Sequence, residues 1–174
     1  KDVENFWKGI LGKEKQHNES ADWINNVEFS TSDIPQQEWE DFTLKELENA
    51  LKKSQKWKSP GIDKVPNFWL NSLSSSHQDL TRLLNEIMRN PQSTPSWLCE
   101  GNTYLLAKAK DTKDPKNYRP ITCLSTTYKL LTSNLTERKY QHLENHNLFP
   151  IEQKGCKRNS YGCKDQLLIN KMII

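Results

Sequence analysis

A run of apolar residues at helical spacing lies in the middle of the chain and limits the folds that the chain can adopt. Its members recur at intervals of three and four positions: Leu80, Leu83, Leu84, Ile87 and Met88. Apolar residues at this spacing fall on one face of an α-helix. Ser76 and Asp79 are typical of a first helical turn, and Pro91 ends the pattern. The run therefore predicts an amphipathic helix that is buried on one side and has a structural role.

Two further helices are predicted on either side of a loop rich in Pro, Gly and Lys. Thr43 and Glu46 form a T-x-x-E capping box, and apolar residues at helical spacing follow them to about residue 55. The loop WKSPGIDKVP then contains the Pro60–Gly61 pair, which favours an exposed turn. A second helix is expected from about Val65 to Leu73.

The second half of the chain predicts a β-hairpin followed by two helices. Thr103–Ala107 is rich in strand formers, residues 117–121 suit the return strand, and DTKDPK suits the tip. Ser125 is placed to cap a long helix over about 125–143, and a basic loop leads into a last helix over 163–174. Basic residues lie on or beside the hairpin: Lys108, Lys110, Lys113, Lys116 and Arg119. The predicted fold class is α+β, mainly helical with a basic β-hairpin.

Charge divides the chain into two regions. Residues 1–42 hold 4 Lys+Arg and 10 Asp+Glu, net 4 − 10 = −6, so residues 43–174 carry 21 − 12 = +9. The acidic stretch contains Trp7, Trp23 and Trp39 but no sustained periodicity, although Asp2–Ile10 suits a helix. We expect a peripheral acidic arm whose tryptophans pack on the helical layer. A basic region suggests a phosphate-bearing partner, although charged surfaces are more often simply solvated.

Several protein classes are disfavoured by the sequence. It contains no run of eighteen apolar residues and no signal-peptide pattern, so we expect a soluble, intracellular chain with no membrane partner. Cysteines are widely spaced without a C-x-x-C pair, and the histidines do not complete a zinc pattern. Reduced, mostly buried thiols are therefore expected at Cys99, Cys123, Cys156 and Cys163.

Three segments of the chain carry a recognisable pattern: KSPGIDKVP at 58–66, KNYRPITCLSTTYKLLTSNLTER at 116–138 and QKGCKRNSYGCKDQLL at 153–168. In order and spacing, they resemble the early motif blocks of reverse transcriptases from non-LTR (LINE-type) retrotransposons. Each block alone is weak, but three in order make a specific match over about residues 43–174. The resemblance implies that this region forms the fingers subdomain and the start of the palm, and that the chain stops before the palm sheet.

The resemblance also implies roles for individual basic residues. Lys108, at the end of the hairpin strand, and Arg119, in the YRPI string, match residues that contact the triphosphate of the incoming nucleotide. The alternatives are an exposed lysine and a structural ion pair. Ala107 stands where the family often has proline, and Asn159 where it often has glycine. Template or primer contacts are implied for Lys58, Gly61, Lys64, Gln153, Lys154, Gly155, Lys157 and Arg158.

Catalytic residues are not predicted in this chain. A polymerase of this family needs carboxylates that hold two Mg²⁺ ions, and the family places them further along the sequence. Asp165, the only acid after Glu152, suits a helix start. No metal ligand is predicted here, and Mg²⁺ is a cofactor of the complete polymerase. Its implied partners are an RNA template, an RNA–DNA hybrid, deoxynucleoside triphosphates and the palm and thumb domains, with a nuclear site of action.

Three alternatives remain open at this point. The chain could be a catalytically inactive, retrotransposon-derived fragment that binds RNA, or a remnant without a selected role. It could also be an interaction protein in which the tryptophans of the acidic arm bind a partner. Tyr128 and Tyr161 could stack on bases, but aromatic residues at helix starts are more often core. Apolar faces of the helices over 125–143 and 163–174 would normally meet a palm sheet, so we expect them to be exposed.

Overall fold

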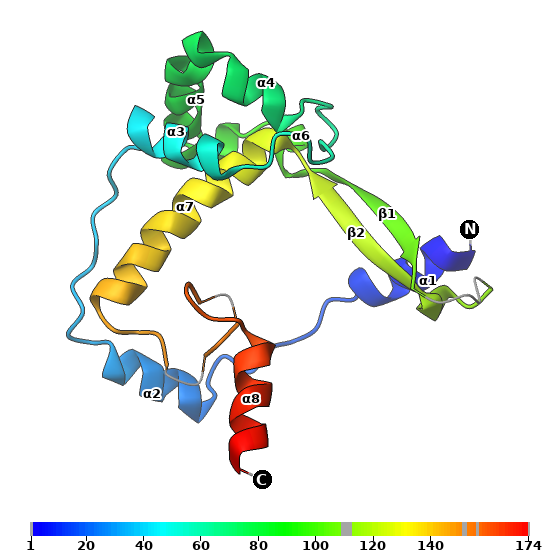
Figure 1. The fold of residues 1–174 in the computed structure, drawn as a ribbon, viewed down its shortest axis with the longest axis vertical. Coiled ribbons are helices and arrows are strands. Elements are labelled where there is room, and N and C mark those ends of the chain that lie inside the picture. The colour runs from blue at the N-terminus through cyan, green and yellow to red at the C-terminus, as the bar shows by residue number, and fades with distance from the viewer. Residues whose placement is uncertain (1, 109–112, 151–152, 156, 174) are drawn as a thin grey trace. The chain divides into compact units, whose positions relative to one another are not determined.

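The computed structural model describes residues 2–108, 113–150, 153–155 and 157–173. Its fold is α+β, with helices and one two-stranded antiparallel sheet in the described residues (Figure 1). This confirms the predicted fold class at the level of α+β. The chain divides into two compact units, residues 1–134 and 135–174, and each is considered by itself.

Most of the helices and both strands are short. The α-helices are α1 (Asp2–Leu11), α2 (Asp22–Ser30), α3 (Leu44–Lys53), α4 (Asn67–Ser72), α5 (His77–Arg89), α6 (Ser96–Cys99), α7 (Thr126–Asn145) and α8 (Cys163–Ile173). The 3-10 turns are η1 (Ser74–Ser76), η2 (Pro91–Ser93) and η3 (Pro115–Asn117), and the strands are β1 (Gly101–Ala107) and β2 (Tyr118–Leu124).

The predicted capping box starts helix α3. The Thr43 side chain accepts a hydrogen bond from the Glu46 amide (3.2 Å), and the Glu46 carboxylate accepts one from the Thr43 amide (2.8 Å). This reciprocal pair satisfies two amide groups that the helix leaves without partners, a contribution of about 1 kcal/mol. The helix ends at Lys53, two residues before the predicted end, because Ser54 is already extended.

Helix α5 packs against α3 and supplies the centre of the core. Leu47 of α3 and Leu84 of α5 are both 0% exposed. The predicted amphipathic helix is therefore confirmed, but Leu83 is 41% exposed, and Asn85 lies on the buried face. The buried apolar residues of the first unit are Phe42, Leu47, Ala50, Leu51, Leu84, Ile87, Leu98, Leu130 and Leu131.

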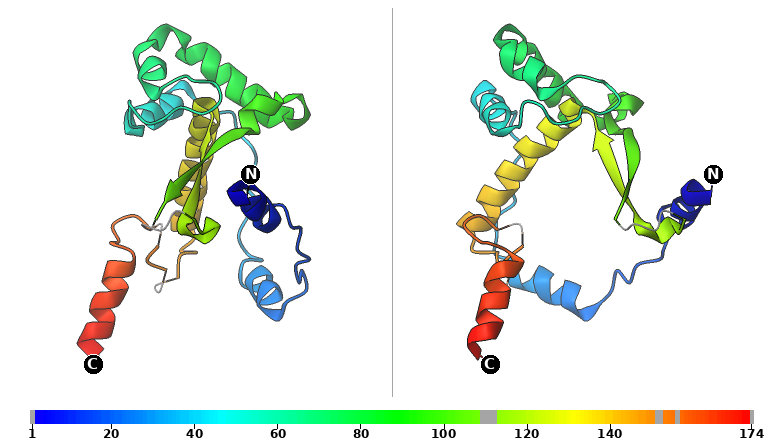
Figure 2. Two further views of the ribbon diagram at one scale, coloured as in Figure 1. Left: turned by 90° about the vertical axis from the view of Figure 1, so that its right-hand side faces the viewer. Right: turned by 45° about the vertical axis from the view of Figure 1, so that its right-hand side comes forward.

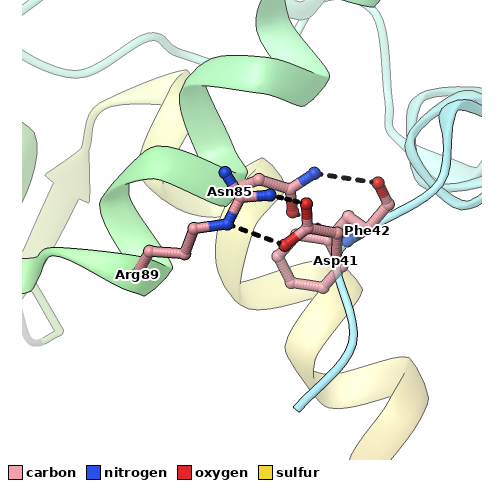
Figure 3. A network of polar contacts seen from close by, with 4 residues as sticks. All are labelled: Asp41, Phe42, Asn85 and Arg89. Atoms are coloured by element: carbon pink, nitrogen blue, oxygen red, sulfur yellow. Dashed lines mark hydrogen bonds and ion pairs between the residues drawn. The ribbon is translucent and has the colours of Figure 1, made fainter.

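Two side chains of α5 hold the end of the acidic arm. The Asn85 amide accepts a hydrogen bond from the Phe42 N–H (2.7 Å) and donates one to the Phe42 carbonyl (3.0 Å). Arg89 pairs with Asp41 one turn further along (Figure 3). Phe42 is only 3% exposed, so the last two residues of the arm pack on α5.

The rest of the arm differs from expectation in two ways. Helix α1 confirms the predicted helix near the N-terminus, but α2 was not predicted. Trp39 packs edge-on against Phe42 with ring centroids 5.3 Å apart, whereas Trp23 is 68% exposed. The prediction that the tryptophans of the arm pack on the helical layer is therefore wrong for Trp23.

The hairpin has the predicted position and longer strands. Gly101 pairs with Leu124 and Ala107 pairs with Tyr118 in a regular antiparallel ladder. Both views in Figure 2 show β1 and β2 leaving the helical cluster where α7 begins. A hydrogen bond from the Ser125 hydroxyl to the Leu98 carbonyl (3.1 Å) fixes this junction. Asp111 and Thr112 of the predicted tip, and Lys110 beside it, lie outside the described residues.

Helix α7 begins as the sequence predicts. The Ser125 hydroxyl accepts a hydrogen bond from the Tyr128 amide (3.2 Å), which confirms Ser125 as its cap. The expected exposure of apolar residues is wrong for the first half of α7, where Leu130 and Leu131 are buried. In the second unit it is confirmed for α8: Leu167, Leu168, Ile169 and Met172. None of the helices that the structure describes is long and apolar enough to cross a membrane.

Candidate nucleic-acid interface

The two residues assigned to nucleotide phosphates share one face of the hairpin. Leu106 pairs with Arg119, and the Lys108 amide donates to the Asn117 carbonyl (2.8 Å), which continues the ladder one residue past β1. Side chains alternate between the two faces of a strand, so Leu106, Lys108 and Arg119 lie on the same face. Lys108 and Arg119 are then diagonal neighbours, with Cα atoms about 7–8 Å apart.

This face is open to solvent and carries apolar groups between its charges. Tyr104 is 54% exposed, Leu106 53% and Ile121 41%, and Lys108 and Arg119 are exposed as well. Among the described residues, no carboxylate forms an ion pair with Arg119. The face can therefore offer two cations and an apolar surface to a ligand.

The SPGID loop is docked on the junction between β2 and α7. Gly61 is buried, and a Cβ atom there would lie 2.3 Å from the Leu124 carbonyl carbon and 2.4 Å from the Ser125 nitrogen. Only glycine allows two backbones to approach this closely. Gly61 is not among the glycines with positive φ, so close backbone approach rather than a left-handed turn accounts for glycine here. Gly61 therefore positions the loop and offers no surface to a ligand.

Asp63 ties the same loop to the start of α7. Its carboxylate accepts a hydrogen bond from the Thr126 amide (2.9 Å), and the Thr126 hydroxyl donates to the Val65 carbonyl. The Lys129 ammonium donates to the Ser59 carbonyl (3.1 Å). No local pattern predicts these contacts, because Asp63 and Thr126 are 63 residues apart. Two of the three motif segments thus meet at one junction.

Replacing Asp63 by alanine is expected to lower the free energy of unfolding by about 1 kcal/mol, since it removes a cap from the first turn of α7. Hydrogen exchange of the Thr126 amide should accelerate in the variant, because this amide loses its acceptor. Asp33→Ala, at an exposed position, is the matched control. Equal exchange rates at Thr126 in the Asp63→Ala variant and the parent protein would contradict the capping role.

The two lysines assigned to template contacts in this loop are exposed. Lys58 and Lys64 flank the docked glycine on either side. Lys64 has φ 53°, in the left-handed region that residues other than glycine occupy only when surrounding contacts hold them there. The neighbouring Asp63 and Val65 contacts with Thr126 supply that constraint. The docked loop therefore holds the backbone of Lys58 and Lys64 in place, and their side chains extend from it into solvent.

In the second unit, Arg158 is held by the end of α7. Its guanidinium donates to the Glu137 carboxylate (2.7 Å) and lies over the Tyr140 ring, 4.1 Å from the centroid. The Arg158 amide also donates to the Tyr140 hydroxyl (2.8 Å). The hydrogen bond to Glu137 raises the pKa of Arg158 above its ordinary value. Arg158 is thus engaged within the chain, a contact that sequence reasoning missed.

The remaining residues of the basic loop are arranged around this contact. Lys154 and Lys157 are half-buried, and the Lys157 ammonium lies 5.9 Å from the centroid of the Phe149 ring. The Gln153 side chain donates to the Gly155 carbonyl (2.7 Å). Asn159 has φ 58°, which explains why glycine suits this position, since both residue types tolerate the left-handed region.

Comparison with known proteins gives no family assignment. The chain matches no protein-family model, and no curated protein matches it. The residues that the structure describes contain no cluster of three His, Cys, Asp or Glu side chains that could hold a metal ion. The first unit therefore has two groups of basic residues, one on the hairpin face and one on the docked loop. The second unit has a basic loop of its own.

Proposed function

We propose that this chain is the fingers region and the start of the palm of an RNA-directed DNA polymerase from a non-LTR retrotransposon. The observation that carries the proposal is the placement of Lys108 and Arg119 on one exposed face of the hairpin. The motif resemblance assigns both residues to the triphosphate of the incoming nucleotide. A single ligand can reach both only if they share a face.

The chemistry of the reaction suits such a pair. Polymerisation is an in-line phosphoryl transfer, and cations that neutralise the departing pyrophosphate need only be positioned correctly. Lys108 supplies a point charge, whereas Arg119 can donate two parallel hydrogen bonds to phosphate oxygens. The exposed apolar side chains Leu106 and Ile121 lie on the same face and would pack beside the base or sugar.

Template contacts are proposed for the lysines of the two basic loops. Lys58 and Lys64 project from the loop that is anchored at the base of the hairpin, so nucleotide and template sites share one support. Lys154 and Lys157 supply the corresponding charges in the second unit. We assign no catalytic step to this chain, because the resemblance places the Mg²⁺ ligands further along the family's sequence.

The template assignment is tested by the salt dependence of RNA binding. Replacing Lys58, Lys64, Lys154 and Lys157 together by glutamine should reduce the slope of log K against log [salt] by about 3, since each contact with a single strand contributes about 0.7. Fluorescence anisotropy with a labelled single-stranded RNA measures the slope. The control replaces four exposed lysines elsewhere, with the same change in net charge: Lys13, Lys15, Lys45 and Lys139.

The control separates specific contacts from general attraction. We expect the control variant to keep nearly the full slope. Equal reductions in both variants would mean that RNA responds only to net charge, and the template assignment would then be wrong. An unmeasurably weak interaction of the parent protein with RNA at low salt would contradict the proposal as well.

A further inference from the structure

A large aromatic side chain is held on the surface of the first unit with one ring face open. Trp57 is 75% exposed, although tryptophan is among the residues that gain most from burial. Its indole stacks on Phe68 with ring centroids 4.6 Å apart and planes 13° apart. Phe68 therefore covers one face of the Trp57 indole, and the opposite face is open to solvent.

The backbone around Trp57 fixes this arrangement. The Phe68 amide donates to the Lys56 carbonyl (3.0 Å), and the Asn67 side chain donates to the Gln55 carbonyl (2.9 Å). These bonds join the residues before Trp57 to the first turn of α4. The indole is thus pre-organised, and a ligand that stacks on it would lose little entropy in ordering the site.

Exposed lysines lie close to Trp57 in the sequence. Lys56 and Lys58 are the neighbours of Trp57 in sequence, and both are exposed. Lys52 and Lys64 add two more exposed ammonium groups on the adjoining helix and loop. Aromatic rings interspersed with lysines are the pattern that proteins use to bind single strands, where bases stack and phosphates meet cations. An apolar protein partner would instead have to desolvate these charges.

We propose that the open face of Trp57 stacks on a base of single-stranded nucleic acid, while Lys56 and Lys58 contact its phosphates. The inference rests on the proposed function. It adds a residue that contacts a base, whereas the lysines contact phosphates. Stacking on a base is worth about 1–3 kcal/mol and does not depend on sequence. Trp57 is therefore a platform for any base rather than a determinant of sequence preference.

The test compares three variants in the same RNA-binding assay. Trp57→Ala should weaken binding by between about 5-fold and 150-fold, which corresponds to the stacking energy of one base. The salt slope should stay unchanged, because no phosphate contact is removed. Trp57→Phe should restore most of the affinity, since it keeps a ring on Phe68. Trp23→Ala is the control, because Trp23 is similarly exposed (68%) but lies in α2.

A second probe isolates the base. A strand of ribose and phosphate without bases should bind the parent protein and Trp57→Ala equally, and a single-stranded DNA should show the same loss as RNA. Equal RNA affinities of Trp57→Ala and the parent protein would overturn the inference while leaving the proposed function intact. A change in oligomeric state with no change in RNA binding would overturn it in favour of a protein contact. If the parent protein binds no RNA, both proposals fail.

Discussion

Replacing Gly61 by alanine is expected to release the SPGID loop and to lower the free energy of unfolding by about 3 kcal/mol or more. The added Cβ would lie within 2.4 Å of backbone atoms of Leu124 and Ser125. Those atoms belong to the end of β2 and the start of α7, so no side-chain rotation can relieve the overlap. The loop, the strand end or the helix start must move.

Urea unfolding and amide exchange measure this effect separately. We expect an earlier unfolding midpoint and loss of protection at the Thr126 amide, whose acceptor, Asp63, lies in the displaced loop. Gly9→Ala is the control, since nothing lies within 4 Å of a Cβ built there. An unchanged midpoint together with a protected Thr126 amide in Gly61→Ala would show that the close approach is not required.

The second large effect is expected in the core. Leu84→Ala should destabilise the first unit by about 2–5 kcal/mol, because truncating a fully buried leucine loses its burial and leaves a cavity. Leu84 is 0% exposed and faces α3, where Leu47 is equally buried. The expected loss is a large part of the total stability of a small unit.

The adjacent residue provides a matched control for this substitution. Leu83→Ala makes the same chemical change one position earlier, where the side chain is 41% exposed. Urea unfolding followed by circular dichroism should give a clearly smaller loss for Leu83→Ala. Equal losses of unfolding free energy in Leu84→Ala and Leu83→Ala would mean that both leucines are buried, contrary to the observed exposure of Leu83.

Local signals account for the elements that could be predicted from the sequence. The capping box at Thr43 and Glu46 specifies the start of α3 through groups three residues apart, and the structure contains both of its bonds. The spacing of apolar residues in α5 and the strand formers of β1 are likewise patterns within a single element. Such patterns can be recognised from the sequence alone. Helix α2 was not predicted, because its segment has no periodic pattern of apolar residues.

The site depended on contacts that the sequence does not encode locally. Asp63 lies in the loop rich in Pro, Gly and Lys, and only the fold brings it to Thr126. Arg158 looked like another basic residue of its loop, although Glu137 and Tyr140 engage it. Thiols expected to be mostly buried are exposed at Cys99 and Cys163 among the described cysteines. Hydrophobic character alone did not decide burial in so polar a chain.

Titration of a deoxynucleoside triphosphate into ¹⁵N-labelled protein shows whether the hairpin face binds nucleotide phosphates. We expect amide shift changes around Lys108 and Arg119, much weaker changes with the corresponding nucleoside, and their loss in Lys108→Ala/Arg119→Ala. Lys113→Ala/Lys116→Ala is the control, with two basic residues replaced beside the same hairpin. Shift changes that bypass the hairpin, or that persist in Lys108→Ala/Arg119→Ala, would mean that nucleotide phosphates do not bind at this face.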